Sequence, residues 1–148
     1  MLTSPDFKEL LSLFTAHKVR YLVVGGYAVM KYSEPRFTKD LDLWIAVDRS
    51  NAAAVFAALK EFGAPLAGLS EADFQEPGYV YQMGRAPLRV DILMSVEGVD
   101  FDQAWRKRVE VGIDGTSIPF IAKDDLIVAK RVAGRPQDLI DLQNLEQS

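Results

Sequence analysis

Cysteine is absent from the 148-residue sequence, and histidine occurs once, as His17. A chain without cysteine has no disulfide, no thiolate nucleophile and no zinc site built on sulfur, and it suits a reducing cytoplasm, where we expect it to be. Long apolar runs are missing too: no stretch approaches the roughly 18 apolar residues of a membrane helix, and the N-terminal segment lacks the pattern of a secretion signal. We therefore expect no association with a membrane.

An excess of positive charge is also missing. Seventeen basic and twenty-one acidic side chains give a formal net charge of −4, which disfavours a broad, sequence-independent grip on nucleic acid. Hydrophobic residues make up 49% and charged residues 26%, which are ordinary proportions for a globular protein. At this length we expect a single domain over residues 1–148, with a core at about 20–121 and C-terminal helices at about 122–147.

Hydrophobic periodicity and turn residues predict an alternation of helices and strands. The predicted helices are 5–18, 27–33, 51–63 with Ser50 as its N-cap, a short one from Asp100, 123–133, and one from Pro136 to about 147. The predicted strands are 21–24, 40–47, 79–83, 88–94, 109–113 and 116–121, and residues 64–77 read as a loop with room for one helical turn. This order predicts an α+β fold, a mixed β-sheet with helices packed on one side and a C-terminal helical pair.

Two aspartates stand at the start of the predicted strand 40–47. Alternate residues of a strand project from the same face, so the Asp40 and Asp42 carboxylates point the same way, with Cα atoms about 6.6 Å apart. Leu41 and Leu43 point to the opposite face and should anchor the strand in the core. Two like charges on so apolar a strand call for a cation, unless both aspartates lie at a solvent-exposed strand end.

A third carboxylate, Asp91, lies in the middle of the apolar strand 88–94. A buried acid is paired or metal-bound, so Asp91 either binds a metal or forms an ion pair with Arg89 or another arginine. Three carboxylates from two strands offer the hard oxygen ligands that Mg²⁺ prefers, with Mn²⁺ as its alternative. They also suit a two-metal site for phosphoryl or nucleotidyl transfer.

The pair Gly25–Gly26 follows a strand and opens a helix, where free backbone N–H groups can face phosphate oxygens. Its spacing fits neither a Walker A loop nor a dinucleotide-binding fingerprint, and the pair can also be read as a tight turn alone.

The order of these residues resembles the DNA polymerase β-like nucleotidyltransferase superfamily. Its pattern is a hydrophobic residue, Gly-Gly or Gly-Ser, a short spacer, Asp-x-Asp or Asp-x-Glu, and a third acid on a later strand. The matching residues here are Val24, Gly25, Gly26, Asp40, Asp42 and Asp91. The segment RFTKDLDLW is similar to the small bacterial minimal or toxin-type (AbiEii-like) members, and the resemblance runs from Tyr21 to Leu145.

The resemblance implies a nucleotidyltransferase fold and a magnesium-dependent transfer of a nucleoside monophosphate from a triphosphate, such as ATP, to a hydroxyl, with release of pyrophosphate. It implies that Asp40 and Asp42 bind both magnesium ions, and that Asp91 binds one and helps to deprotonate the attacking hydroxyl. Gly25 and Gly26 would seat the triphosphate.

Further residues are predicted to bind the nucleotide. Lys130, Arg135 and Asp138 resemble a motif that lines the nucleotide cleft in toxin-type relatives. Arg36 and Thr38 precede the catalytic strand, where they can contact phosphate or substrate. The alternatives are a helix-surface cation for Lys130, and favourable helix-start charge for Asp138 and Asp141.

Several properties stay open. The second glycine replaces the serine that many active relatives carry, so one hydroxyl contact to phosphate is missing. The acceptor can be RNA, protein or a small molecule. The rivals to a transferase are a non-catalytic nucleotide- or protein-binding module of the same fold, as half of a toxin–antitoxin pair with a small helical partner protein, and a metal-dependent phosphohydrolase.

Overall fold

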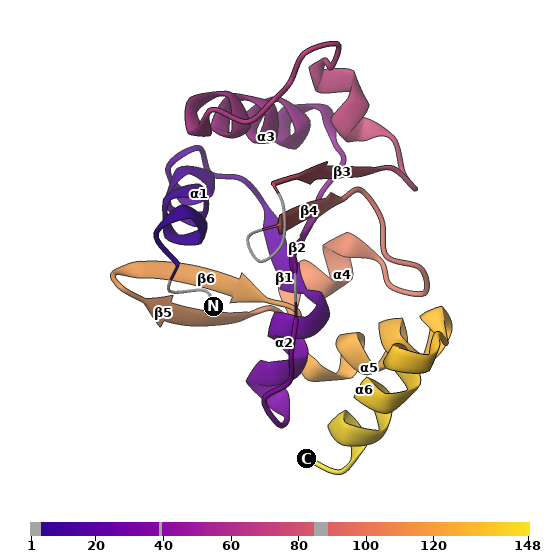
Figure 1. Ribbon diagram of the computed structural model, residues 1–148. Helices are drawn as coiled ribbons and strands as arrows, with labels where there is room; N and C mark the ends of the chain where they lie inside the picture. The colour runs from indigo at the N-terminus through magenta and orange to yellow at the C-terminus, as the bar shows by residue number, and fades with distance from the viewer. Residues whose placement is uncertain (1–3, 39, 85–88) are drawn as a thin grey trace.

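A computed structural model describes residues 4–38, 40–84 and 89–148 of the chain. Its centre is a six-stranded mixed sheet with the strand order β3-β4-β2-β1-β6-β5 (Figure 1). The pairs β2/β4 and β1/β6 are parallel, and the other neighbouring strands are antiparallel. The strands are β1 (Tyr21–Val24), β2 (Asp40–Ile45), β3 (Val80–Met83), β4 (Arg89–Leu93), β5 (Val109–Ile113) and β6 (Thr116–Phe120).

Helices pack around the sheet (Figure 1). They are α1 (Pro5–Ala16), α2 (Gly25–Tyr32), α3 (Arg49–Phe62), the 3₁₀ helix η1 (Glu71–Gln75), α4 (Phe101–Arg106), α5 (Lys123–Ala133) and α6 (Pro136–Glu146). Helices α1 and α3 pack together, whereas α5 and α6 form a pair that contacts α2 (Figure 1). The predicted α+β class, with a mixed sheet and a C-terminal helical pair, is confirmed. None of the helices in the described part of the chain combines the length and apolarity that a membrane crossing requires.

The two faces of β2 have different tasks. Leu41, Leu43 and Ile45 are fully buried on one face. Asp40, Asp42 and Trp44 alternate with them and therefore lie on the other face, where the Trp44 ring packs edge-on against Phe101 of α4 at 5.0 Å between centroids. The central position of β2, between β1 and β4, thus holds two aspartates on a rigid element.

Helix α3 begins two residues earlier than the sequence indicated. Ser50 was predicted as its N-cap, but the N-cap is Asp48, whose side chain accepts a hydrogen bond from the Asn51 backbone N–H at 2.9 Å. Both residue types cap helices well, and tertiary contacts decide between them. The buried Asn51 side chain donates to the Ala46 carbonyl at 2.7 Å, which fixes the chain between β2 and α3 with Asp48 at the cap.

Replacing Asp48 by alanine should lower the free energy of unfolding by about 1 kcal/mol, because the substitution leaves a helix-terminal N–H without its acceptor. Urea denaturation measures this change. Ser50→Ala, inside the first turn of the same helix, should stay within about 0.5 kcal/mol of the wild-type protein. Equal losses in the two variants would contradict the assignment of Asp48 as the cap.

Candidate active site

Three carboxylates converge on one face of the sheet. The parallel pairing of β2 and β4 places Asp42 opposite Asp91, and Asp40 opposite Arg89. One oxygen from each of Asp40, Asp42 and Asp91 lies within 4.8 Å of the others. Asp91 is buried and the two aspartates of β2 are partly buried. The strands therefore bring the three predicted acids together in a space that one or two divalent cations could share.

The environment of Asp42 disfavours its negative charge. Burial raises its pKa from 3.8 to about 7, and the neighbouring charges of Asp91 and Asp40 act in the same direction. The positive charges of Lys130 and Arg89 offset part of this effect. A site that penalises a carboxylate in this way gains most from a bound cation, since the cation favours the ionised form of all three acids.

Arg89 pairs with two of the three acids. Its Nε and Nη2 donate to the two oxygens of Asp91 at 3.1 and 3.0 Å, so the ion pair that the sequence offered as the alternative role of Asp91 is present. Arg89 Nε also lies 3.3 Å from Asp40 Oδ1, yet this buried oxygen accepts no hydrogen bond from the described residues. Hard carboxylate oxygens with one such atom left unsatisfied fit the donor set of Mg²⁺ or Mn²⁺.

Gly25 and Gly26 lie where the carboxylates meet the first turn of α2. Gly25 has a φ of +69°, and a side chain there would overlap Asp42 Oδ2 and place its Cβ 2.9 Å from Asp42 Cγ. A Cβ at Gly26 would lie 2.6 Å from Thr38 Oγ1 and 3.1 Å from Arg36 Nη2. The glycine pair therefore does more than form a turn. It lets Asp42 and Thr38 approach the backbone at the positive end of a helix.

A Gly25→Ala substitution should cost stability and disturb the acids. The left-handed φ alone costs about 1–2 kcal/mol for a non-glycine residue, and the new methyl group must also displace Asp42. Gly63→Ala is the matched control, because Gly63 has a φ of +91° with nothing within 4 Å of an added Cβ. We expect both variants to unfold at lower urea concentration, and the stabilisation by Mg²⁺ and nucleotide to be lost in Gly25→Ala alone. Retention of that stabilisation in Gly25→Ala would contradict the contact.

The C-terminal helices bring a buried cluster of charges to this end of the sheet. Lys130 of α5 is 8% exposed, and its Nζ lies 3.2 Å from Asp138 Oδ1 and 3.0 Å from Asp141 Oδ2. Arg135 Nε donates to Asp138 Oδ2 at 2.6 Å. The helix-surface alternative for Lys130 is therefore wrong. Burial acts to raise the pKa of Asp138, but hydrogen bonds from Arg135 and Lys130 outweigh it and hold that pKa below its usual value.

Arg36 connects this cluster to the loop before β2. Its Nη2 donates to Asp141 Oδ2 at 3.1 Å, and its Nε lies 3.0 Å from Asp141 Oδ1. Asp141 is fully buried, and its role in this cluster was missed by the sequence analysis, which read it as favourable charge near a helix start. A useful signal was available: Asp138 and Asp141 are three residues apart, so both face the same side of α6, as a buried lysine requires.

The charged cluster and the three acids interact electrostatically. The charge of Lys130 offsets part of the rise in the pKa of Asp42, and the charge of Asp42 contributes to the raised pKa of Arg135. Of the residues predicted to bind the nucleotide, the structure places Gly25 and Gly26 beside Asp42, Thr38 and Arg36. Lys130, Arg135 and Asp138 pair with one another in the cluster, which Arg36 joins through Asp141.

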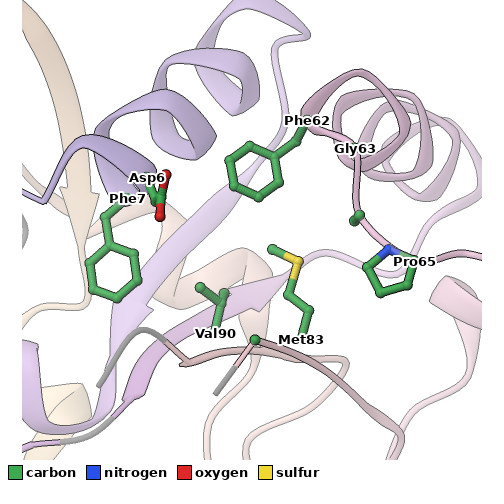
Figure 2. Close-up of a pocket in the computed structure, with 9 residues that line it drawn as sticks. Asp6, Phe7, Phe62, Gly63, Pro65, Met83 and Val90 are labelled. Carbon is green, nitrogen blue, oxygen red and sulfur yellow. The ribbon is translucent and has the colours of Figure 1, made fainter. Parts of the chain in front are cut away.

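A separate hollow of about 200 Å³ lies between α1, α3 and the strands β3 and β4 (Figure 2). Its lining is mostly apolar and includes Phe7, Phe62, Met83 and Val90. Because Val90 and Asp91 alternate along β4, this hollow opens on the opposite face of the sheet from the carboxylates. It is not the space in which the three acids converge.

Comparison with known proteins agrees with this arrangement. The sequence profile of a family described as nucleotidyltransferase of unknown function (DUF6036) matches residues 6–147. No curated protein sequence matches the chain.

Solved structures with the same fold are distant in sequence. The lincosamide antibiotic adenylyltransferase LnuA, with lincomycin bound, is 18% identical with a TM-score of 0.58, over 97% of this chain and 96% of its own. ANT(2")-Ia, in complex with adenylyl-2"-tobramycin, is 14% identical with a TM-score of 0.60, over 93% of this chain and 84% of its own. A nucleotidyltransferase-like structure from Thermotoga maritima is 16% identical with a TM-score of 0.59, over 92% of this chain and 87% of its own.

These structures confirm the predicted nucleotidyltransferase fold. The profile match spans nearly the whole chain, including β2, β4 and both C-terminal helices. The protein therefore belongs to the nucleotidyltransferase family known as DUF6036.

Proposed function

We propose that the protein transfers a nucleoside monophosphate from a nucleoside triphosphate to a hydroxyl group, with magnesium as its cofactor and pyrophosphate as the leaving group. The observation that carries this proposal is the convergence of Asp40, Asp42 and Asp91 beside the first turn of α2. The acids offer a cation site, and the helix start offers N–H groups to an anion, so the two features together suit a metal-bound triphosphate.

In this proposal each residue has a defined task. Asp40 and Asp42 would hold both Mg²⁺ ions, and Asp91 would hold one and help to accept the proton of the attacking hydroxyl. When bound, the ions neutralise phosphate charge and align the attacking and leaving oxygens. Gly25 and Gly26 admit the triphosphate to the helix start, with the positive charge of Lys130 and Arg135 nearby.

Thr38 fills the space that a side chain at position 26 would occupy. Its Oγ1 donates to the Asp40 carbonyl at 3.3 Å and lies beside the Gly26 backbone. We propose that this hydroxyl contacts a phosphate oxygen and so compensates for the serine that position 26 lacks. The Thr38→Val variant, which keeps the shape and removes the hydroxyl, addresses this role.

We propose ATP as the nucleotide and a small hydroxyl-bearing molecule as the acceptor. Two structural neighbours support this proposal by the ligands that they bind. ANT(2")-Ia holds adenylyl-2"-tobramycin, and the adenylyltransferase LnuA holds lincomycin. The net charge of −4 argues against RNA. The toxin-type relationship, the small helical partner protein and the cytoplasmic location stay predictions from the sequence.

The first test measures thermal stability against Mg²⁺ with and without ATP, GTP, CTP and UTP. A ligand that binds the folded state must raise the apparent stability. A shift that requires both Mg²⁺ and ATP, followed by pyrophosphate release with a hydroxylated acceptor, supports the proposal. Metal-dependent binding without pyrophosphate release across many acceptors would favour the non-catalytic module, and release of phosphate without acceptor labelling would favour the phosphohydrolase.

A further inference from the structure

Arg89 occupies an unusual place beside the three acids. It lies directly opposite Asp40 in the β2/β4 register, on the same sheet face as the carboxylates. Its guanidinium makes two hydrogen bonds to Asp91 and lies 3.3 Å from Asp40 Oδ1. The side chain is nevertheless 37% exposed, so solvent reaches it while it is paired. Arg89 therefore balances the negative charge of Asp91 and Asp40 while its own side chain stays partly exposed to solvent.

Arg89 and a divalent cation compete for the same oxygens. Each Asp91 oxygen accepts one hydrogen bond from Arg89, so a metal that binds either oxygen would share it with the guanidinium. A guanidinium at hydrogen-bond distance also repels a divalent cation placed among the same carboxylates. A divalent cation among the three acids therefore favours an Arg89 side chain that turns away from Asp91.

An arginine that leaves two carboxylates needs other acceptors. Its planar fork matches phosphate oxygens as well as carboxylate oxygens, and its partly exposed position on the acid face needs only a change of side-chain rotamer to release the fork. The triphosphate proposed above would arrive on this same face together with the metal. It would offer anionic oxygens at the moment when Asp91 is taken up by the cation.

We propose that Arg89 exchanges its carboxylate partners for phosphate: it pairs with Asp91 and Asp40 in the metal-free protein and binds the nucleotide triphosphate once a divalent cation occupies the acids. This inference rests on the proposed metal and nucleotide site. It predicts effects of opposite sign for one substitution, since removing Arg89 removes a competitor of the metal and also a ligand of the nucleotide.

The test titrates Mn²⁺ alone, followed by calorimetry, and then ATP at saturating Mg²⁺, in the wild-type protein and in Arg89→Gln. We expect Arg89→Gln to bind Mn²⁺ about tenfold more tightly and ATP about tenfold more weakly, each about 1.4 kcal/mol. Arg131→Gln is the charge-matched control, because Arg131 is 58% exposed and lies 3.6 Å from its partner Glu146. It should change neither affinity more than about twofold.

Each result of these titrations either supports or overturns the proposed exchange of partners by Arg89. Unchanged or weaker Mn²⁺ binding in Arg89→Gln overturns the proposal, and so does tighter Mn²⁺ binding with unchanged ATP binding. If the wild-type protein binds both ligands and Arg89→Gln behaves identically, the exchange alone fails. If neither the wild-type protein nor any variant binds Mn²⁺ or ATP, both the exchange and the proposed function are overturned. Arg89→Lys keeps the charge without the fork and should give intermediate affinities, which provides the same test if Arg89→Gln does not fold.

Discussion

Asp42→Asn is expected to make the metal-free protein more stable and at the same time to remove its response to Mg²⁺ and ATP. Burial and the charges of Asp91 and Asp40 raise the pKa of Asp42 to about 7, so at pH 8 the folded state carries an unfavourable carboxylate that an amide would replace without charge. A rise of about 3 pH units corresponds at most to about 4 kcal/mol, and we expect about 2 kcal/mol because solvent and local rearrangement relieve part of the penalty.

The sign of the pH dependence follows from the same group. Because the pKa of Asp42 is higher in the folded state than its ordinary 3.8, the folded state binds more protons between about pH 4 and pH 7. The contribution of Asp42 to stability is therefore greatest below pH 4, falls as pH rises, and is lost above about pH 7. Urea denaturation in EDTA should show the gap between Asp42→Asn and the wild-type protein widening from pH 5 to pH 8.

The response to ligand should change in the opposite direction. In the wild-type protein, Mg²⁺ and ATP at 100 times the dissociation constant add about 2.7 kcal/mol of apparent stability, and Asp42→Asn should lose this increment. Asp102→Asn is the control, because Asp102 is 70% exposed and outside the acid cluster, so it should preserve the ligand response. Should Asp42→Asn destabilise the metal-free protein, Asp42 would be a structural carboxylate instead.

The sequence predicted part of the acid cluster because that part of its geometry is local. Strict alternation along β2 places Asp40 and Asp42 on one face, and an acid within the apolar strand β4 marks Asp91. The register that sets Asp42 beside Asp91 depends on the pairing of β2 with β4, which are far apart in the chain. Alternation alone does not determine that pairing.

The contacts that were missed depend on distant elements. A lysine on a helix is ordinarily exposed, so the sequence around Lys130 does not indicate burial. Lys130 is buried because it forms ion pairs with Asp138 and Asp141 on the next helix. The choice of Asp48 over Ser50 as a cap depends on the buried Asn51 contact with Ala46. Arg36 was predicted to contact phosphate or substrate, and its pairing with Asp141 was not foreseen. In each case a charged or polar side chain is fixed by a tertiary partner that local periodicity does not reveal.

The largest loss of folding stability is expected for Asp141→Asn. Asp141 is fully buried and is the shared anion for Lys130 at 3.0 Å and Arg36 at 3.1 Å. Removing one partner of a buried charge network leaves the remaining charges uncompensated, which typically costs about 3–5 kcal/mol. Glu146→Gln on the same helix removes an acid that is 52% exposed, and should cost less than about 0.5 kcal/mol. Both values are measurable by urea denaturation.

A double-mutant cycle separates the charge network from simple packing. Lys130→Met alone leaves Asp141 with less compensation, whereas Lys130→Met combined with Asp141→Leu removes the charge pair from a buried site. If uncompensated charge is the cause, the double variant should lose less free energy of unfolding than Lys130→Met and Asp141→Leu lose in sum. The difference should be at least about 1 kcal/mol. Strictly additive losses would show that Asp141 acts through its packing. A remaining deficit in the double variant reports two further lost contacts, that of Asp138 with Lys130 and that of Arg36 with Asp141. The Arg36 contact links α6 to the loop that carries Thr38 beside Gly26.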